Sequence, residues 1–92
     1  MVCTFESDQS RHTITYHNRD MLIDGKYKVF YQKTYNGKNK WRTSIYKNKL
    51  YTSKTVNYGP GEYFIYITNS YGLKDSGTCF DKEDNDMYEY GR

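Results

Sequence analysis

Two histidines and two aspartates near the start of the sequence are the residues best suited to acid–base or metal chemistry. His12 and His17 are five residues apart, and Asp20 and Asp24 follow them closely. In a strand, a separation of five places two side chains on opposite faces, which is poor geometry for chelating one metal ion. We therefore interpret these four as solvated polar residues. The sequence predicts no catalytic residue, no metal and no cofactor, and hence a protein that is not an enzyme.

The two cysteines, Cys3 and Cys79, lie near opposite ends of the chain, and neither has a histidine beside it to suggest a zinc site. The first residues, MVCTFESDQSRH, contain no apolar signal segment, so we expect reduced thiols and a cytoplasmic protein. The alternative is a disulfide between the first and last strands. No apolar run approaches the length of a membrane span, so the sequence predicts no membrane partner.

The most unusual segment is residues 26–54, which carries nine Lys and Arg, seven aromatic residues and no Asp or Glu. Lys and Arg can neutralise phosphates while exposed rings stack on bases, and the same residue types can anchor an acidic protein surface. The alternative is lysines that protect an edge strand from aggregation. We expect an anionic macromolecular partner, a protein more than a nucleic acid, bound by Lys26, Lys28, Phe30, Lys38, Lys40, Arg42, Tyr46 and Lys49.

The register of a hairpin at Asn36-Gly37 decides which of these side chains share a face. A two-residue loop would pair Tyr35 with Lys38 and interleave tyrosines with positive charges. A three-residue loop would pair Thr34 with Lys38 and separate the faces more cleanly, so we favour it. It would place Tyr27, Val29 and Tyr31 with Trp41, Thr43 and Ile45 on one apolar face. In either register, Lys38, Lys40, Arg42 and Tyr46 share a face.

The elements that position these residues are predicted to be strands. The chain has no Ala and is rich in Tyr, Thr, Ile and Val, which favours strands over helices. Short alternating runs separated by turn residues indicate an all-β or β-dominated α+β domain, a small antiparallel meander, barrel or sandwich built around the Lys26–Tyr46 hairpin. Strands are expected at residues 2–5, 11–17, 21–23, 26–35, 38–46, 50–57, 62–68 and 76–80.

Residues 1–80 are predicted to form a single domain, with residues 81–92 as an acidic C-terminal tail. The tail holds five of the eleven acidic residues and only two basic ones, so the body of the chain is more basic than the overall charge of +3 indicates. The tail either folds over the basic face or solubilises the chain as a disordered end.

Together these features predict a non-enzymatic binding protein. Abundant Lys, Asn, Tyr and Ile with no Ala is typical of an AT-rich genome, so we expect a phage- or mobile-element-encoded inhibitor of a host protein or nucleoprotein complex. The alternative is a nucleic-acid-binding β-barrel module.

Overall fold

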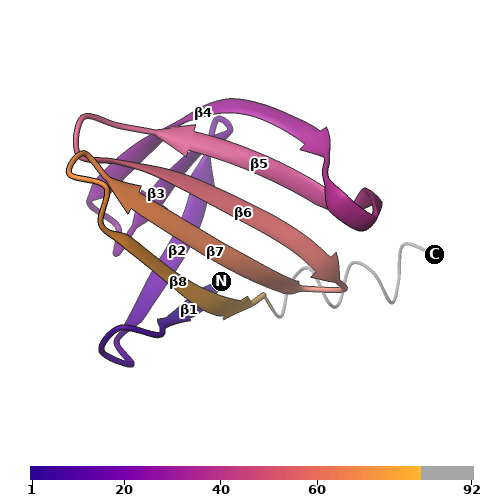
Figure 1. Ribbon diagram of the computed structural model, residues 1–92, viewed down its shortest axis with the longest axis horizontal. Helices are drawn as coiled ribbons and strands as arrows, with labels where there is room; N and C mark the ends of the chain where they lie inside the picture. The colour runs from indigo at the N-terminus through magenta and orange to yellow at the C-terminus, as the bar shows by residue number, and fades with distance from the viewer. Residues whose placement is uncertain (82–92) are drawn as a thin grey trace.

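The computed structural model describes residues 1–81 of the 92, and they form a closed barrel of eight antiparallel strands. Each strand pairs with the next along the chain, and the last pairs with the first (Figure 1). The strands are β1 (Val2–Phe5), β2 (Arg11–His17), β3 (Asp20–Ile23), β4 (Tyr27–Asn36), β5 (Arg42–Lys47), β6 (Tyr51–Gly59), β7 (Glu62–Asn69) and β8 (Lys74–Phe80), with a short 3-10 turn, η1 (Lys38–Lys40), between β4 and β5.

The predicted all-β fold is confirmed, and it takes the barrel form. The strands expected at residues 2–5 and 11–17 have the bounds predicted for them, and the others differ mostly by one or two residues at an end. Among the described residues, no helix is long and apolar enough to cross a membrane. The predicted acidic tail lies, except for Asp81, outside the described residues.

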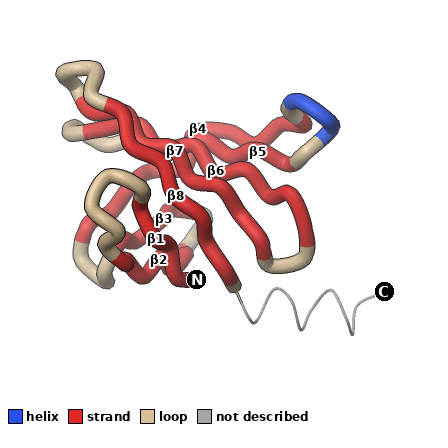
Figure 2. The backbone as a smooth tube through the Cα atoms, turned by 60° about the horizontal axis from the view of Figure 1, so that its bottom comes forward, coloured by secondary structure: helices blue, strands red, loops and turns tan. Residues whose placement is uncertain are grey.

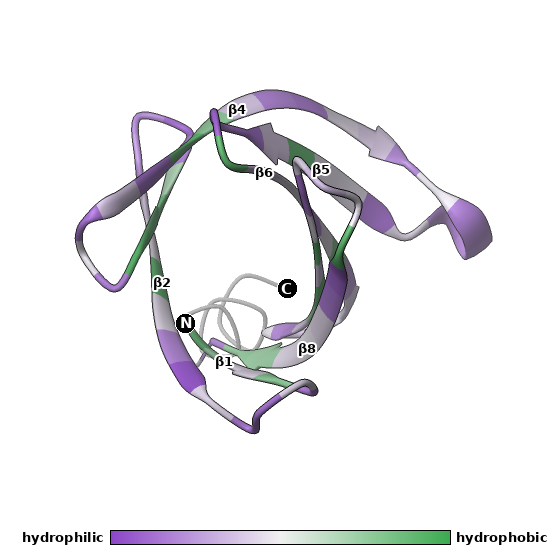
Figure 3. Cartoon of the chain, turned by 60° about the vertical axis from the view of Figure 1, so that its left-hand side comes forward, coloured by the Kyte–Doolittle hydropathy of each residue, from purple (hydrophilic) through white to green (hydrophobic). Residues whose placement is uncertain are grey.

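The barrel interior is filled by one side of each strand, because successive side chains of a strand point to opposite faces. On β7 the fully buried Ile65 points inward, and its neighbours Phe64 and Tyr66 therefore point outward. The view along the barrel shows apolar stretches alternating with polar ones along the strands (Figure 3). The buried apolar core consists of Cys3, Phe5, Ile14, Met21, Ile23, Val29, Tyr46, Ile65 and Cys79.

The prediction of reduced cysteines is wrong. Cys3 on β1 and Cys79 on β8 are directly opposite each other, and their sulfur atoms form a disulfide. Both residues are fully buried. Closure of the barrel explains the pairing, because it brings the first and last strands together although 76 residues separate the two cysteines. The N-terminal strand β1 therefore has a neighbouring strand on both sides, β2 and β8.

Both predicted registers of the β4–β5 hairpin are also wrong. Asn36 pairs with Arg42, so the connecting loop has five residues and includes η1 (Figure 2). Gly37 does not supply the left-handed conformation, which Asn39 and Lys40 adopt with φ values of 61° and 60°. A Cβ at Gly37 would lie 2.8 Å from Oγ1 of Thr43, so a larger residue would require that side chain to shift.

A bulge in the same hairpin overturns the predicted faces. The register shifts between Tyr31 and Lys33, and Tyr31 pairs with Tyr46. Their rings contact each other edge to face, with centroids 5.8 Å apart. Tyr46 is buried in the core, so its predicted place on an exposed face with Lys38, Lys40 and Arg42 is wrong. The extra residues in the loop and the bulge put Trp41 on the outside, away from Val29.

Candidate partner-binding face

The seven remaining residues of the predicted site are exposed, but they form two separate groups. Lys28 and Phe30 lie in the first half of β4, and the side-chain amide of Asn48 donates to Lys28 O, which brings the β5–β6 turn with Lys49 to the same end. Lys38 and Lys40 lie beyond the other end of β4, in η1. Ten residues of strand span about 33 Å. The structure therefore does not bring the predicted residues together in one site.

Arg42 belongs to the second group along the chain but to a different face. It shares one side of β5 with Ser44 and the buried Tyr46, by the alternation of the strand. Burial raises the pKa of Tyr46, and the positive charge of Arg42 is close enough to oppose that rise. Arg42 thus faces the mouth of the barrel, whereas the neighbouring Trp41 faces outward.

The outer surface carries a row of aromatic rings that runs from the loop before β5 across β6 to β7. We call Trp41, Tyr58, Phe64 and Tyr66 the aromatic strip. The ring centroids of Trp41 and Tyr58 are 6.2 Å apart, those of Tyr58 and Phe64 are 4.2 Å apart in a stacked arrangement, and those of Phe64 and Tyr66 are 6.5 Å apart. Trp41 and Tyr66 retain 38% and 42% of their surface accessible to solvent. The strip is therefore an exposed apolar feature of the barrel.

Lysines flank the aromatic strip in register with it. Across the outer face, Lys33 lies opposite Ile45, Ile45 opposite Lys54, and Lys54 opposite Tyr66. The amine of Lys54 lies 5.2 Å from the ring centroid of Tyr66, and that of Lys33 lies 5.5 Å from the ring of Tyr35. Lys33 and Lys54 are two strand spacings apart, which is about 10 Å.

No acidic residue interrupts this surface on β4, β5 or β6. The sequence contains no Asp or Glu from residue 26 to residue 61. Within residues 1–81, the only ion pair joins His12 and Asp24, so none of the nine Lys and Arg of the segment has a carboxylate partner there. Their charges are therefore not neutralised by the described part of the barrel.

Sequence reasoning missed most of the aromatic strip, although a signal for it was present. The stretch 62–68, EYFIYIT, has apolar side chains on both faces, which is the pattern of a buried central strand. In the barrel the inner face of β7 carries Tyr63, Ile65 and Ile67, and the outer face carries Phe64 and Tyr66. The two isoleucines share one face in that alternation, which would have indicated that Phe64 and Tyr66, on the other face, point outward. Tyr58 could be placed only with the register of the β6–β7 turn.

A second polar cluster joins the β1–β2 turn to the β3–β4 turn. Nδ1 of His12 lies 2.7 Å from Oδ2 of Asp24, and Nε2 lies 3.0 Å from Oγ of Ser10. This order of serine, histidine and aspartate is that of an activated nucleophile. Here, however, hydrogen bonds from Ser10 also engage Asp8 and lower the pKa of that carboxyl. The other oxygen of Asp24 accepts from the backbone N–H of Thr13, so we interpret the cluster as a brace between two turns.

The chemistry of a metal site has no counterpart in the described part of the barrel. His17 and Asp20 pair across β2 and β3, but Oδ1 of Asp20 accepts a hydrogen bond from Tyr31 N at 2.8 Å. Within residues 1–81, no three His, Cys, Asp or Glu side chains come together in a way that could hold a metal ion.

Comparison of the chain with protein-family models, curated proteins and solved structures finds no match.

Proposed function

We propose that the protein is a non-enzymatic binding protein that docks the outer face of β4–β7 onto an acidic surface of another protein. The observation that carries this proposal is the aromatic strip, exposed beside the lysines of β4, β5 and β6, three strands that contain no acidic residue. Exposed apolar patches with a polar rim mark interaction sites on soluble proteins. Trp, Tyr and Arg are the commonest anchors of such interfaces.

The faces of the aromatic rings already contact other side chains, which favours a protein over a nucleic acid as the partner. Bases bind to single-strand platforms by stacking on open aromatic faces. Tyr58 and Phe64 already stack on each other, and the amines of Lys33 and Lys54 lie over the rings of Tyr35 and Tyr66. A base would have to displace these contacts. An acidic protein surface would instead pair with the amines and pack against the ring edges.

The lysines and the aromatic rings of this face would contribute to binding in different ways. Lys33, Lys54 and the lysines of η1 would steer an acidic partner toward the barrel and favour its association. Trp41 and the rest of the aromatic strip would lose water and supply most of the binding free energy. A protein that covers its target in this way acts as an inhibitor when the covered surface is one that the target uses. The phage or mobile-element origin and the host partner remain predictions from composition.

Trp41 gives a direct readout of binding, because it is the only tryptophan of the chain. Its fluorescence is titrated with three probes: a 20-residue peptide that alternates Glu with Leu, a 20-residue oligo-Glu and a 20-nucleotide oligo-dT. The proposal predicts the tightest binding by the mixed peptide, because only this probe offers both carboxylates and apolar groups. Capture from a lysate after nuclease treatment then identifies the natural partner.

The dependence on salt distinguishes the nucleic-acid alternative. Four or five neutralised phosphates would weaken binding roughly a hundredfold between 50 and 200 mM salt, because each releases a counterion. We expect negligible oligo-dT binding at physiological salt. Micromolar oligo-dT binding with that steep slope, tighter than binding of the mixed peptide, would overturn the proposal in favour of a nucleic-acid-binding barrel.

A further inference from the structure

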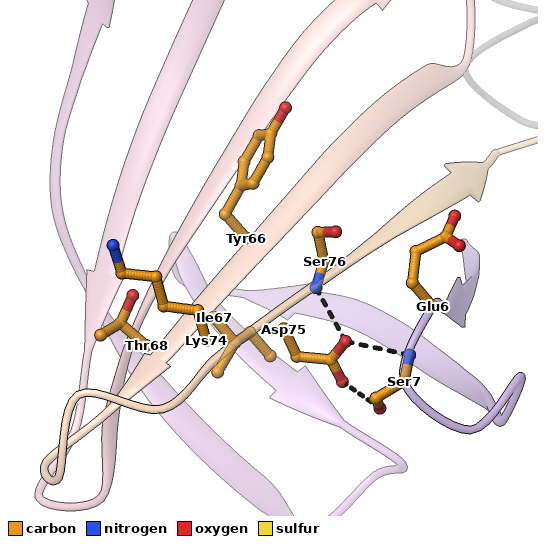
Figure 4. Close-up of a pocket in the computed structure, with 8 residues that line it drawn as sticks. All are labelled: Glu6, Ser7, Tyr66, Ile67, Thr68, Lys74, Asp75 and Ser76. Atoms are coloured by element: carbon orange, nitrogen blue, oxygen red, sulfur yellow. Dashed lines mark hydrogen bonds between the residues drawn. The ribbon is translucent and has the colours of Figure 1, made fainter.

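A pocket of about 450 Å³ lies beside the aromatic strip, where β7, β8 and the β1–β2 turn meet (Figure 4). Its hollow shape follows from residue size. Tyr66 lies opposite Ser76, and the backbone N–H of Glu6 donates to Ser76 O at 2.7 Å, so the three residues form one row across the outer face. The small Ser76 separates two larger side chains. Tyr66 and Glu6 are therefore opposite walls, about two strand spacings or 10 Å apart.

The wall that carries Glu6 is held in place by a neighbouring carboxylate. Asp75 accepts hydrogen bonds from Ser76 N at 2.8 Å, from Ser7 N at 3.3 Å and from the Ser7 hydroxyl at 2.7 Å. Figure 4 shows the two bonds from Ser7 joining Asp75 on β8 to the β1–β2 turn. They use both oxygens of Asp75 to fasten the turn. The pocket therefore has a firm backbone on this side, and Asp75 is a structural residue.

The side chain of Glu6 is exposed to solvent. Its carboxylate makes no hydrogen bond and no ion pair within residues 1–81. An exposed carboxylate across a pocket from an aromatic ring suits a cation, which can pair with the charge and lie over the π-face. Lys54 approaches Tyr66 from β6, whereas the pocket lies on the β8 side of the same residue. The amine that lies over the ring of Tyr66 therefore comes from β6 and not from the pocket side.

The charge of Lys74 restricts which ligands can bind in the pocket. Lys74 also lines the pocket, and Figure 4 shows its amine near Thr68, across the pocket from Glu6. The pocket thus presents a carboxylate on one side and an ammonium on the other. A ligand that carries a cation with a carboxylate beside it matches both. Arginine fits the cationic part better than lysine, because the planar guanidinium stacks on a ring and pairs with a carboxylate through two hydrogen bonds.

We propose that this pocket is a subsite for an arginine side chain of the protein partner, held between Tyr66 and Glu6, with an adjacent acidic residue of the partner on Lys74. The inference rests on the proposed function for the identity of the partner, because the pocket adjoins the aromatic strip through Tyr66. The subsite requires more of the partner than an acidic surface. The partner must also carry one arginine at the end of its contact surface.

The test uses the dipeptide N-acetyl-Arg-Asp-amide on the full chain. Binding is followed by the backbone amide shifts of Ser7, Lys74 and Ser76 in two-dimensional NMR spectra. We expect saturable shifts at these amides. Replacing Arg by citrulline, which keeps the shape and removes the charge, should weaken binding roughly tenfold, the range for one charge-assisted hydrogen bond. Glu6→Gln and Tyr66→Leu should each weaken it by a similar factor, and Glu62→Gln and Tyr71→Leu, outside the pocket, should leave it unchanged.

Two results would overturn the inference: equal binding of the citrulline and arginine dipeptides, or undiminished binding by Glu6→Gln. The spectra also show whether each variant is folded, so loss of structure is not mistaken for loss of binding. Failure here is distinguishable from failure of the proposed function, which is read from Trp41 with acidic peptides. Shifts near Trp41 without shifts at Ser7 and Ser76 would support the face and reject the arginine subsite.

Discussion

Trp41 is the side chain on which the proposed binding function depends most. It lies just outside β5, contacts Tyr58, and keeps 38% of its surface exposed although Trp is the largest apolar residue. Its backbone carbonyl accepts from Gly37 N at 2.8 Å, which closes the hairpin loop whatever the side chain is. The indole ring is therefore available for a partner, while the backbone holds the loop.

Trp41→Ala should weaken binding of the mixed acidic peptide by tenfold or more, the loss typical of an interface anchor, with little change in melting temperature. Because this variant has no tryptophan, binding is measured by calorimetry. Tyr71→Ala is the matched control, since Tyr71 is 89% exposed in the β7–β8 turn, away from the strip. Equal binding by Trp41→Ala and the unchanged chain would remove the strip from the interface.

Asp24 gives a prediction on pH. The hydrogen bond from His12 and that from Thr13 N lower the pKa of Asp24. A carboxyl whose pKa is lower in the folded state stabilises the fold above its unfolded pKa of about 3.9, and this contribution is lost as pH falls through the folded value. Asp24→Asn should therefore lower the melting temperature at pH 7 more than at pH 2.5. An equal decrease in melting temperature at both pH values would show that the ionised form of Asp24 is not what stabilises the fold.

At the scale of elements, the outer rows of β4, β5 and β6 bring together lysines that are distant in sequence. Lys33→Glu with Lys54→Glu should abolish binding of acidic peptides by reversing the charge beside the strip. Lys26→Glu with Lys49→Glu makes the same change of charge at the far end of β4 and should retain most of the binding. Exposed charges contribute little to stability, so all four substitutions should leave the fold intact. Comparable losses from both pairs would indicate attraction by net charge alone.

The seam between β1 and β8 depends on a small residue. Gly77 is buried opposite Phe5, and a Cβ there would lie 2.5 Å from the carbonyl oxygen of Thr4. The obstacle is backbone, which cannot rotate away. Gly77→Ala should therefore destabilise the barrel by about 2–4 kcal/mol, the range of severe local strain. Ser76→Ala, one residue earlier, should cost far less in chemical denaturation, and equal midpoints for the two would show that the seam can relax.

The sequence predicted these elements better than it predicted how they meet. Alternation and turn residues located the strands, because strand formation depends on local pattern. The faces of the β4–β5 hairpin depended on a loop of five residues and on the bulge near Tyr31, and Asn36-Gly37 suggested shorter loops. One shift of register moves side chains to the opposite face, which is why Tyr46 was assigned to the surface and Trp41 to the core. The pocket at Glu6 required contacts between chain segments that no local pattern encodes.

At the scale of the whole molecule, the Cys3–Cys79 disulfide links nearly the full length of the described chain. Such a crosslink restricts the unfolded state most when the enclosed loop is long. Reduction should lower the free energy of unfolding by about 2–4 kcal/mol. The check is the denaturant midpoint of the oxidised and the reduced protein, and identical midpoints would contradict it. The cytoplasmic location was predicted from the lack of an apolar signal segment and stays a prediction, whereas disulfides persist mainly in oxidising compartments.

Closure of the barrel also bears on how the protein survives at high concentration. A sheet with a free edge offers unpaired N–H and C=O groups to strands of other chains, which is a route to fibrils. Here β1 and β8 pair with each other, so each described strand has a neighbour on both sides. The barrel can therefore expose aromatic rings without offering a template for cross-β growth. Fibril formation would first require the short β1 to detach, and the disulfide opposes that step directly.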